Sequence, residues 1–420
     1  MEGSGWLLKG GSGARLSQWC GGAAVITLIA LIIRQPLLAL LAFAVTLALG
    51  TALIWRRYGL RQLSYTRSFS QNRAFPGEEI TLEITLENAK VLPLPWLEVE
   101  DEFPNELEYP GMELDLSSLP KVGIFRTIFS IRPYERVRRR YRVTCTKRGR
   151  HRFGPANVST GDIFGFASSH EEIDNTDYLV IYPRVRPVTE FGLPPKQPFG
   201  DDKPMRALME DPIRFSGVRP YTPGDLPRRI HWRASARTGD LQSKQFEPSA
   251  TPVLALFLDV NTFEHFWEGL DSDLLEVTIS AAASLAARGI DDRRQVGLYV
   301  NAPLHGGEHS VRIPPSRHPD QLRRILEALA TLIPHTGNRI ENLIAAESRH
   351  LPWGATIVVV TGNVTAGLEE TLARLFRSGH AITLLTFGEQ KLELPNRPGL
   401  AVYAFKREHA DDPRAAFQLA

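Results

Sequence analysis

Two long uncharged runs near the N-terminus constrain this chain more than any other feature. No charged residue occurs in Trp19–Ile33, and a second uncharged run, Leu37–Trp55, follows the connection Arg34–Pro36. At roughly 1.5 Å per residue, the second run is long enough to cross a hydrocarbon core of about 30 Å. Proline suits the first turn of a new helix, where its missing N–H costs little. The sequence therefore predicts a transmembrane helical hairpin, with a single span as the alternative.

Positive charges flank the predicted hairpin on its outer ends. Lys9 and Arg15 precede it, whereas Arg34 alone lies in the connection, and the residues that follow are Arg56, Arg57 and Arg61. The positive-inside rule places both ends of such a hairpin in the cytoplasm. We therefore expect a multi-pass protein of the inner (plasma) membrane, with a cytoplasmic tail over 1–18, the hairpin over 19–56 and a cytoplasmic soluble body.

The region after the hairpin shows the alternation of a half-buried strand. Residues 79–87 alternate apolar and polar side chains with a period of two, a pattern that a helix could not use. Similar short runs lie around 96–99, 123–131, 138–146 and 178–182, separated by Pro, Gly and Asn. This series predicts an all-β, immunoglobulin-like sandwich over 62–190.

Charge gives little indication of a nucleic-acid partner. The formal net charge is only +2, although five arginines crowd one predicted strand between 136 and 142. Such a strand face could bind lipid headgroups or nucleic acid. A solvated edge strand protected by its charge is the favoured interpretation, and we expect no nucleic-acid partner.

The C-terminal part alternates apolar strands with amphipathic helices. Strands are predicted at 253–260, 295–301, 356–361 and 381–387, and helices at 274–288, 319–333 and 366–378. Regular alternation of this kind predicts an α/β domain with a doubly wound parallel sheet over 251–390, followed by a tail over 391–420. A chain of 420 residues exceeds what one hydrophobic core usually organises, so two soluble domains are expected.

Two stretches of the sequence are more specific. The first reads Arg-Gly-Arg-His-Arg-Phe-Gly-Pro over 148–155 and continues through Gly-Asp-Ile-Phe-Gly-Phe over 161–166 to 180–184. The second reads Gly-Val-Arg-Pro-Tyr-Thr-Pro-Gly-Asp over 217–225, continues over 229–239 and ends at 244–247. Together they resemble the bacterial membrane protein family catalogued as domain of unknown function fifty-eight. That resemblance covers the whole chain and makes 191–250 a signature connector.

The connector itself is rich in turns and in arginine. Asp225 is placed to accept hydrogen bonds from backbone N–H groups or from an arginine such as Arg228 or Arg229. Its partner-binding candidates are Arg219, Asp225, His231, Trp232 and Arg237. Internal pairing, a surface for an acidic protein partner, and phosphate or nucleic-acid binding all remain open, since Arg and Trp are favoured in interfaces.

The resemblance also implies that the C-terminal domain is similar to a von Willebrand A domain. Ligands of open α/β sheets bind beyond the carboxyl ends of strands, which draws attention to Asp259. In the A domains a metal site starts with an aspartate and two alternating serines after that strand, whereas this chain has Asp259, Asn261 and Phe263. Asn261 could still supply an oxygen but Phe263 could not, so a divalent cation at Asp259 and Asn261 would occupy a degenerate site.

No sequence motif indicates catalysis. A Gly-x-x-x-x-Gly-Lys phosphate loop is absent, and no nucleophile elbow surrounds Ser235 near His231. We therefore expect a non-catalytic membrane-anchored scaffold or adaptor. The resemblance implies companions: a cytosolic MoxR-type AAA+ ATPase and a transglutaminase-like membrane protein. The alternative is a metal-dependent ligand receptor or membrane-bound enzyme that uses the strand-end crevice at Asp259.

Overall fold

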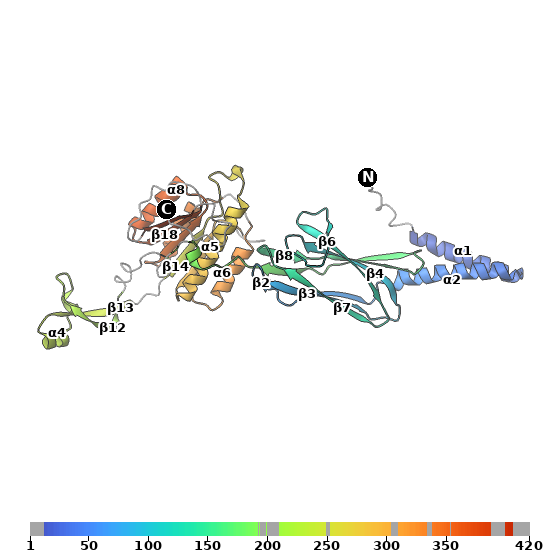
Figure 1. Ribbon diagram of the computed structural model, residues 1–420, viewed down its shortest axis with the longest axis horizontal. Coiled ribbons are helices and arrows are strands. Elements are labelled where there is room, and N and C mark those ends of the chain that lie inside the picture. The colour runs from blue at the N-terminus through green and yellow to red at the C-terminus, as the bar shows by residue number, and fades with distance from the viewer. Residues whose placement is uncertain are drawn as a thin grey trace. The chain divides into compact units, whose positions relative to one another are not determined.

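The fold is known from a computed structural model (Figure 1). It describes residues 12–191, 193, 199, 210–248, 253–303, 310–333, 338–352, 354–387 and 400–405. Two compact units divide the chain, Met1–Ile181 and Tyr182–Ala420.

Two apolar helices open the first unit. Helix α1 is Ser12–Ile32 and helix α2 is Pro36–Tyr58, and Arg34 turns the chain between them with φ 56°. The helices pack side by side, and the hydroxyls of Thr27 and Thr46 lie 3.2 Å apart between them. Both helices are long and apolar enough to cross a membrane. The predicted pair of helices is therefore present, and its insertion in the inner membrane stays a prediction.

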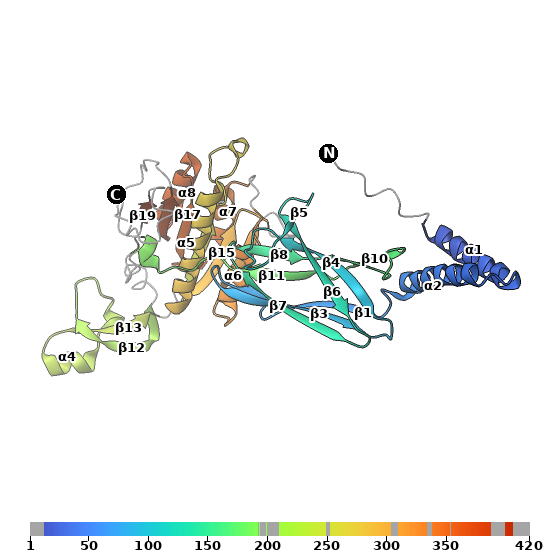
Figure 2. The same ribbon diagram turned by 45° about the vertical axis from the view of Figure 1, so that its right-hand side comes forward.

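Within the described part of the first unit, eleven strands follow and form three sheets around one apolar core (Figure 2). The sheet orders are β1-β3-β7, β10-β9-β4-β6-β5 and β2-β11-β8. The strands are β1 Leu63–Phe69, β2 Arg73–Ala74, β3 Glu79–Asn88, β4 Leu94–Pro104, β5 Asp115–Leu116, β6 Val122–Ile131, β7 Arg136–Thr144, β8 Gly149–Phe153, β9 Ala156–Gly161, β10 Ser168–Ile173 and β11 Asp177–Ile181.

Strand β3 shows why this part folds as sheet. Its apolar side chains Ile80, Leu82, Ile84 and Leu86 are all buried, because alternate residues of a strand face the same side. The arginine-rich β7 is the last strand in its sheet. Ion pairs join its Arg136 and Arg140 to glutamates on β3 at 2.7 Å, which agrees with the interpretation of a charged edge strand.

A charged cluster is buried inside this core. Arg67 of β1 contacts the carboxylate of Asp101 on β4 and lies 3.1 Å from a carboxylate oxygen of Asp177. The Tyr65 hydroxyl donates to Asp101 as well. The side chains of Arg67 and Asp101 are fully buried, so the Arg67 charge depends on these two carboxylates for compensation.

The second unit contains a two-stranded antiparallel ribbon within the predicted connector. A short 3-10 helix, η1 Val188–Phe191, precedes it. The ribbon pairs β12 Glu210–Pro220 with β13 Gln242–Pro248, and between these strands lie the 3-10 helix η2 Pro227–Arg229 and helix α4 Trp232–Thr238. Gly239 ends α4 in the left-handed conformation at φ 81°, which glycine adopts without strain.

A six-stranded, mostly parallel sheet forms the rest of the described second unit, in the order β16-β15-β14-β17-β18-β19. Only β16 is antiparallel among these strands. The strands are β14 Val253–Leu258, β15 Gln295–Val300, β16 Val311–Ser316, β17 Thr356–Thr361, β18 Ala381–Phe387 and β19 Leu400–Phe405. Continuous burial of β14, β17 and β18 explains their uninterrupted apolar sequences.

Helices cover both faces of this sheet (Figure 1). Helices α5 Ser272–Asp291 and α6 Gln321–Ala330 contact each other, as do α7 Ile340–Glu347 and α8 Ala366–Arg377. The 3-10 helices are η3 Phe266–Glu268 and η4 Ser348–His350. Strand β19 lies at 400–405, within the range predicted to be a tail, because it finds its hydrogen-bonding partners on β18. The range predicted as a tail, 391–420, therefore contains a strand of the sheet at these six residues.

Candidate functional site

An arginine–aspartate pair organises the ribbon. The two terminal nitrogens of Arg219 donate to the carboxylate of Asp225 at 2.8 and 2.6 Å. The backbone N–H of Thr222 also donates to this carboxylate, at 3.1 Å. Hydrogen bonds from Arg219, then from Thr222, lower the pKa of Asp225 to about 2. The backbone N–H of Thr222 thus bonds Asp225, as the sequence predicted, and Arg219 from the preceding strand end is a partner that the sequence had not indicated.

His231 has a local structural role. Its Nδ1 accepts a hydrogen bond from the backbone N–H of Ala234 at 3.0 Å, which caps the first turn of α4. The Ser235 hydroxyl donates to the His231 carbonyl at 3.1 Å and accepts from the N–H of Gln242 at 2.8 Å. These bonds attach α4 to β13. His231 and Ser235 therefore hold the segment together through main-chain contacts.

Helix α4 leaves bulky side chains exposed. Trp232 is 68% exposed, and Arg233 and Arg237 on the same helix are exposed. Three further apolar side chains of the ribbon are exposed by more than two fifths: Val218, Leu226 and Leu241. We name this set, with Trp232, Arg233 and Arg237, the ribbon surface. Of the predicted connector residues, Arg219, Asp225 and His231 serve internal bonds, whereas Trp232 and Arg237 belong to this surface.

The second predicted site, Asp259, lies directly after β14 and is buried. Its Oδ1 accepts hydrogen bonds from the backbone N–H of Asn261 at 3.0 Å and from Nδ2 of Asn301 at 2.7 Å. The Thr361 hydroxyl lies 3.1 Å from Oδ2 of Asp259 and 2.7 Å from the carbonyl of Asn363. Residues at the ends of three neighbouring strands thus converge on one carboxyl group.

The pKa of Asp259 is raised well above that of an exposed aspartate. Burial raises its pKa to about 6, against the opposing effect of the hydrogen bonds from Asn261, Asn301 and Thr361. The orientation of the Asn301 amide follows from its other bonds, because its Oδ1 accepts from the N–H of Val260 and its Nδ2 also donates to the carbonyl of Asn338.

These residues do not fit a divalent cation. Such ions require several oxygen ligands, yet Asp259 presents its oxygens to N–H and O–H donors. The Asn261 amide donates its Nδ2 to the carbonyl of Asn338 at 3.1 Å. Within the described ranges, no three His, Cys, Asp or Glu side chains lie close enough to hold a metal ion.

Sequence reasoning missed Asn301 and Asn338 as partners of this network. Asn301 follows β15, as Asp259 follows β14, so its place at a carboxyl end of a parallel strand was the available signal. Asn338 contributes only its carbonyl oxygen, for which a sequence carries no signal.

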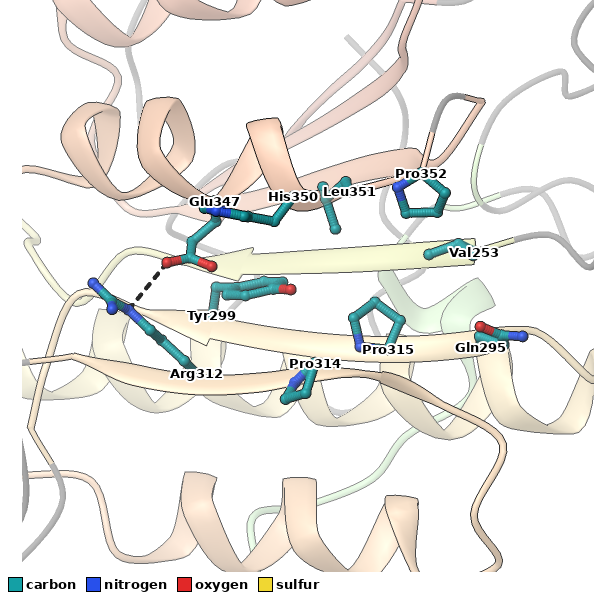
Figure 3. A pocket seen from close by; sticks show the side chains of 10 residues that line it. All are labelled: Val253, Gln295, Tyr299, Arg312, Pro314, Pro315, Glu347, His350, Leu351 and Pro352. Atoms are coloured by element: carbon teal, nitrogen blue, oxygen red, sulfur yellow. Dashed lines mark ion pairs between the residues drawn. The ribbon is translucent and has the colours of Figure 1, made fainter.

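A separate cavity of about 470 Å³ extends along β15, from Gln295 at its start to Tyr299 near its end (Figure 3). Val253 and Gln295, the first residues of β14 and β15, line it together with Tyr299. An ion pair of 3.1 Å between Arg312 and Glu347 stands at one end. The remaining lining residues are Pro314, Pro315, His350, Leu351 and Pro352.

Comparison with known proteins bears on this second unit most directly. Residues 217–407 match the family described as "Protein of unknown function DUF58". The DUF58 match includes the ribbon from Gly217 onward and the parallel-rich sheet, and it supports the resemblance inferred from the signature. The chain is also 24% identical over 339 residues to "Uncharacterized protein YeaD" of Bacillus subtilis (strain 168), covering 80% of this chain and 79% of that protein.

Among solved structures, the matches show only remote likeness. The CARDB domain of the PF1109 protein from Pyrococcus furiosus is 11% identical, covering 28% of this chain and 93% of that chain, with a TM-score of 0.18. A non-cellulosomal cohesin from Archaeoglobus fulgidus is 14% identical, covering 29% of this chain and 91% of that chain, with a TM-score of 0.19. At such scores these likenesses carry no argument about fold or function.

Proposed function

We propose that this protein is a non-catalytic, membrane-anchored scaffold that docks a cytosolic partner through its C-terminal unit. On this proposal α1 and α2 form a hairpin that crosses the inner membrane twice, with the soluble body in the cytoplasm. The β-rich region is an immunoglobulin-like sandwich, and the parallel-rich sheet belongs to a von Willebrand A-like domain. The flanking charges Arg56, Arg57 and Arg61 support this orientation.

The observation that carries the docking proposal is the ribbon surface. Trp232, at 68% exposure, shares a short helix with two exposed arginines, and internal hydrogen bonds fix that helix. Tryptophan and arginine supply much of the binding energy of protein interfaces when a partner covers them. A preformed helix also loses little conformational entropy on binding. The positive charge of Arg233 and Arg237 favours a partner with an acidic surface.

The geometry of Asp259 supports a structural role for the strand-end crevice. Its carboxylate accepts from Asn261 and Asn301 and lies beside the Thr361 hydroxyl, so the group acts as an acceptor that ties strand ends together. The rival proposal of a cation-dependent receptor or enzyme draws no support from this donor set. We therefore assign partner binding to the ribbon surface.

The resemblance to DUF58 proteins names a candidate partner, a MoxR-type AAA+ ATPase, with a transglutaminase-like membrane protein as a further companion. On this proposal the ATPase supplies energy and this chain supplies its place at the membrane. Membranes from cells that make the tagged full-length chain are solubilised gently, with and without a slowly hydrolysed ATP analogue. Captured proteins are then identified by mass spectrometry.

Matched variants make this capture specific. Trp232→Ala and Arg237→Ala should each reduce recovery of the ATPase several-fold, because each removes part of the ribbon surface. Trp267→Ala is the control, since Trp267 is also 68% exposed but lies in η3. Equal recovery with Trp232→Ala and Trp267→Ala would refute the ribbon surface as the docking site. Absence of any AAA+ ATPase from the intact wild-type protein would refute the proposed partner.

A further inference from the structure

The turn that joins β9 to β10, over residues 162–167, exposes apolar side chains and buries its charged one. Its side chains Ile163, Phe164 and Phe166 are 68%, 58% and 55% exposed, whereas its one charged residue, Asp162, is buried. The Asp162 carboxylate accepts hydrogen bonds from the backbone N–H groups of Phe164 and Ala167, at 2.9 and 2.7 Å. The turn is therefore built to keep its polar group inside and its apolar groups outside.

The geometry of this turn is fixed on both sides. Gly165 has a φ of 74°, a conformation that other residues rarely adopt, and it brings the chain back toward β10. The rings of Phe164 and Phe166 are stacked, with centroids 6.0 Å apart. A cluster of exposed apolar side chains on a soluble protein marks a surface that binds a partner or a membrane.

The end of α2 lies against the strands that carry this turn (Figure 2). The Ser169 hydroxyl of β10 donates to the carbonyl of Arg56 at 2.7 Å. Farther along β10, Ile173 lines a cavity together with Leu60 and Leu63. Ile173, at the end of β10, thus lies near Leu63, and Ser169, near the start of β10, lies against Arg56 of α2. The turn continues this direction, toward the apolar stretch of α2 that ends at Trp55.

Two other turns reach the same end of the β-rich region. The indole N–H of Trp55 donates to the carbonyl of Pro93 at 3.0 Å, in the turn between β3 and β4, where Val91 is 69% exposed. The backbone N–H of Tyr134, in the turn between β6 and β7, donates to the carbonyl of Lys90 at 3.2 Å. The Tyr134 side chain is 70% exposed. Exposed apolar or aromatic groups from three turns therefore lie at the end of the β-rich region that meets α2.

We propose that the turn at Ile163, Phe164 and Phe166 inserts into the interface of the lipid bilayer that α2 crosses, with Val91 and Tyr134 at the same level. This inference rests on the proposed membrane anchor. Aromatic and aliphatic side chains partition into the boundary between headgroups and acyl chains, and cationic side chains lie just outside it. Arg57 and Arg61 suit that position, because they follow the apolar stretch of α2 that ends at Trp55. Three inserted turns would fix the orientation of the β-rich region relative to the membrane.

The test uses photocrosslinking of the full-length chain in vesicles of phosphatidylcholine and phosphatidylglycerol. p-Benzoylphenylalanine replaces Phe164 in one sample, and lipid adducts are quantified by mass spectrometry after irradiation. The same probe at Leu116 is the negative control, since Leu116 is 99% exposed and pairs with Gly123 at the opposite end of β6. The probe at Leu41, an exposed residue within α2, reports whether the hairpin is inserted.

Lipid adducts at position 164 should exceed those at position 116 several-fold and approach those at position 41. Strong adducts at 41 with equally weak ones at 164 and 116 would overturn the inference while the anchor stands. Weak adducts at all three positions would overturn the anchor and this inference together. Crosslinks from position 164 to protein in place of lipid would also overturn it, and would identify the turn as a protein interface.

Discussion

Replacement of Asp259 by asparagine tests whether the strand-end network is structural. Asparagine keeps the size of the side chain, and its oxygen can still accept from Asn261 and Asn301. Its amide can donate to the Thr361 hydroxyl, which in turn can donate to the carbonyl of Asn363, 2.7 Å away. The introduced amide carries no charge, so the cost of burying a carboxylate disappears. We expect the variant to fold and to change the pH dependence of stability.

The size of this change follows from the pKa of Asp259, which burial raises from 3.8 to about 6. Below pH 3.8 the Asp259 carboxyl is protonated in both the folded and the unfolded states, so it contributes nothing to the pH dependence of stability. As the pH rises toward the upper value, the unfolded state loses its proton and the folded state keeps it, so the wild type loses stability. The loss is about 3 kcal/mol and is constant at higher pH. The stability of Asp259→Asn relative to the wild type should therefore rise by about 2 to 3 kcal/mol between about pH 4 and about pH 7.

Amide hydrogen exchange of β14 in the full-length protein measures this difference as a local free energy of opening. Asp273→Asn, at an exposed position in the first turn of α5, is the control and should follow the wild type across the same pH range. A relative stability of Asp259→Asn that stays flat or falls as pH rises would refute the reasoning, because the folded protein would then ionise Asp259 without cost. Added Mg²⁺ should leave exchange in β14 of the wild type unchanged.

The remaining predictions concern the β-rich region and the ribbon. Asp101→Ala should lower the free energy of unfolding of the first unit by about 3 to 5 kcal/mol in denaturant titrations, because it leaves the buried Arg67 charge without its closest carboxylate. Adding Arg67→Met to this variant should recover part of that loss, because the uncompensated charge is then removed. Gly154→Ala should cost about 1 to 3 kcal/mol in the same assay, since φ is 87° there and an added Cβ would overlap the backbone oxygen of Asn175. The Arg219–Asp225 pair should protect the ribbon from hydrogen exchange above about pH 4, with protection lost as the pH falls toward about 2, because the pKa of Asp225 is lowered in the folded state. Arg219→Gln should weaken that protection at neutral pH, and equal protection in both proteins would contradict the assigned role.

Local patterns were sufficient for several elements. The predicted strands at 356–361 and 381–387 have the same bounds as β17 and β18, and the alternating run at 79–87 became β3, which extends one residue farther. Hydropathy period and length depend on neighbouring residues alone, so the sequence contains this information. The two apolar helices were predicted for the same reason.

Other elements depend on partners distant in sequence. Strand β16, Val311–Ser316, contains two prolines and was not predicted, because only its position at the edge of the sheet makes proline acceptable. Helix α7 and strand β19 were also missed. Their apolar residues are short runs that become recognisable as elements once the neighbouring sheet buries them.

The contacts of individual side chains also separate into those that the sequence predicts and those that only the fold creates. The sequence by itself determined that the chain has two apolar helices, a β-rich region and an α/β region, since each follows from composition or period, and two of its stretches resemble DUF58 proteins. Only the tertiary structure decided that Asp225 pairs with Arg219, that Asp259 meets Asn301, and that an apolar turn lies beside the end of α2. These contacts are set by strand register and by packing between segments far apart in the chain, and a residue's own neighbours do not specify either.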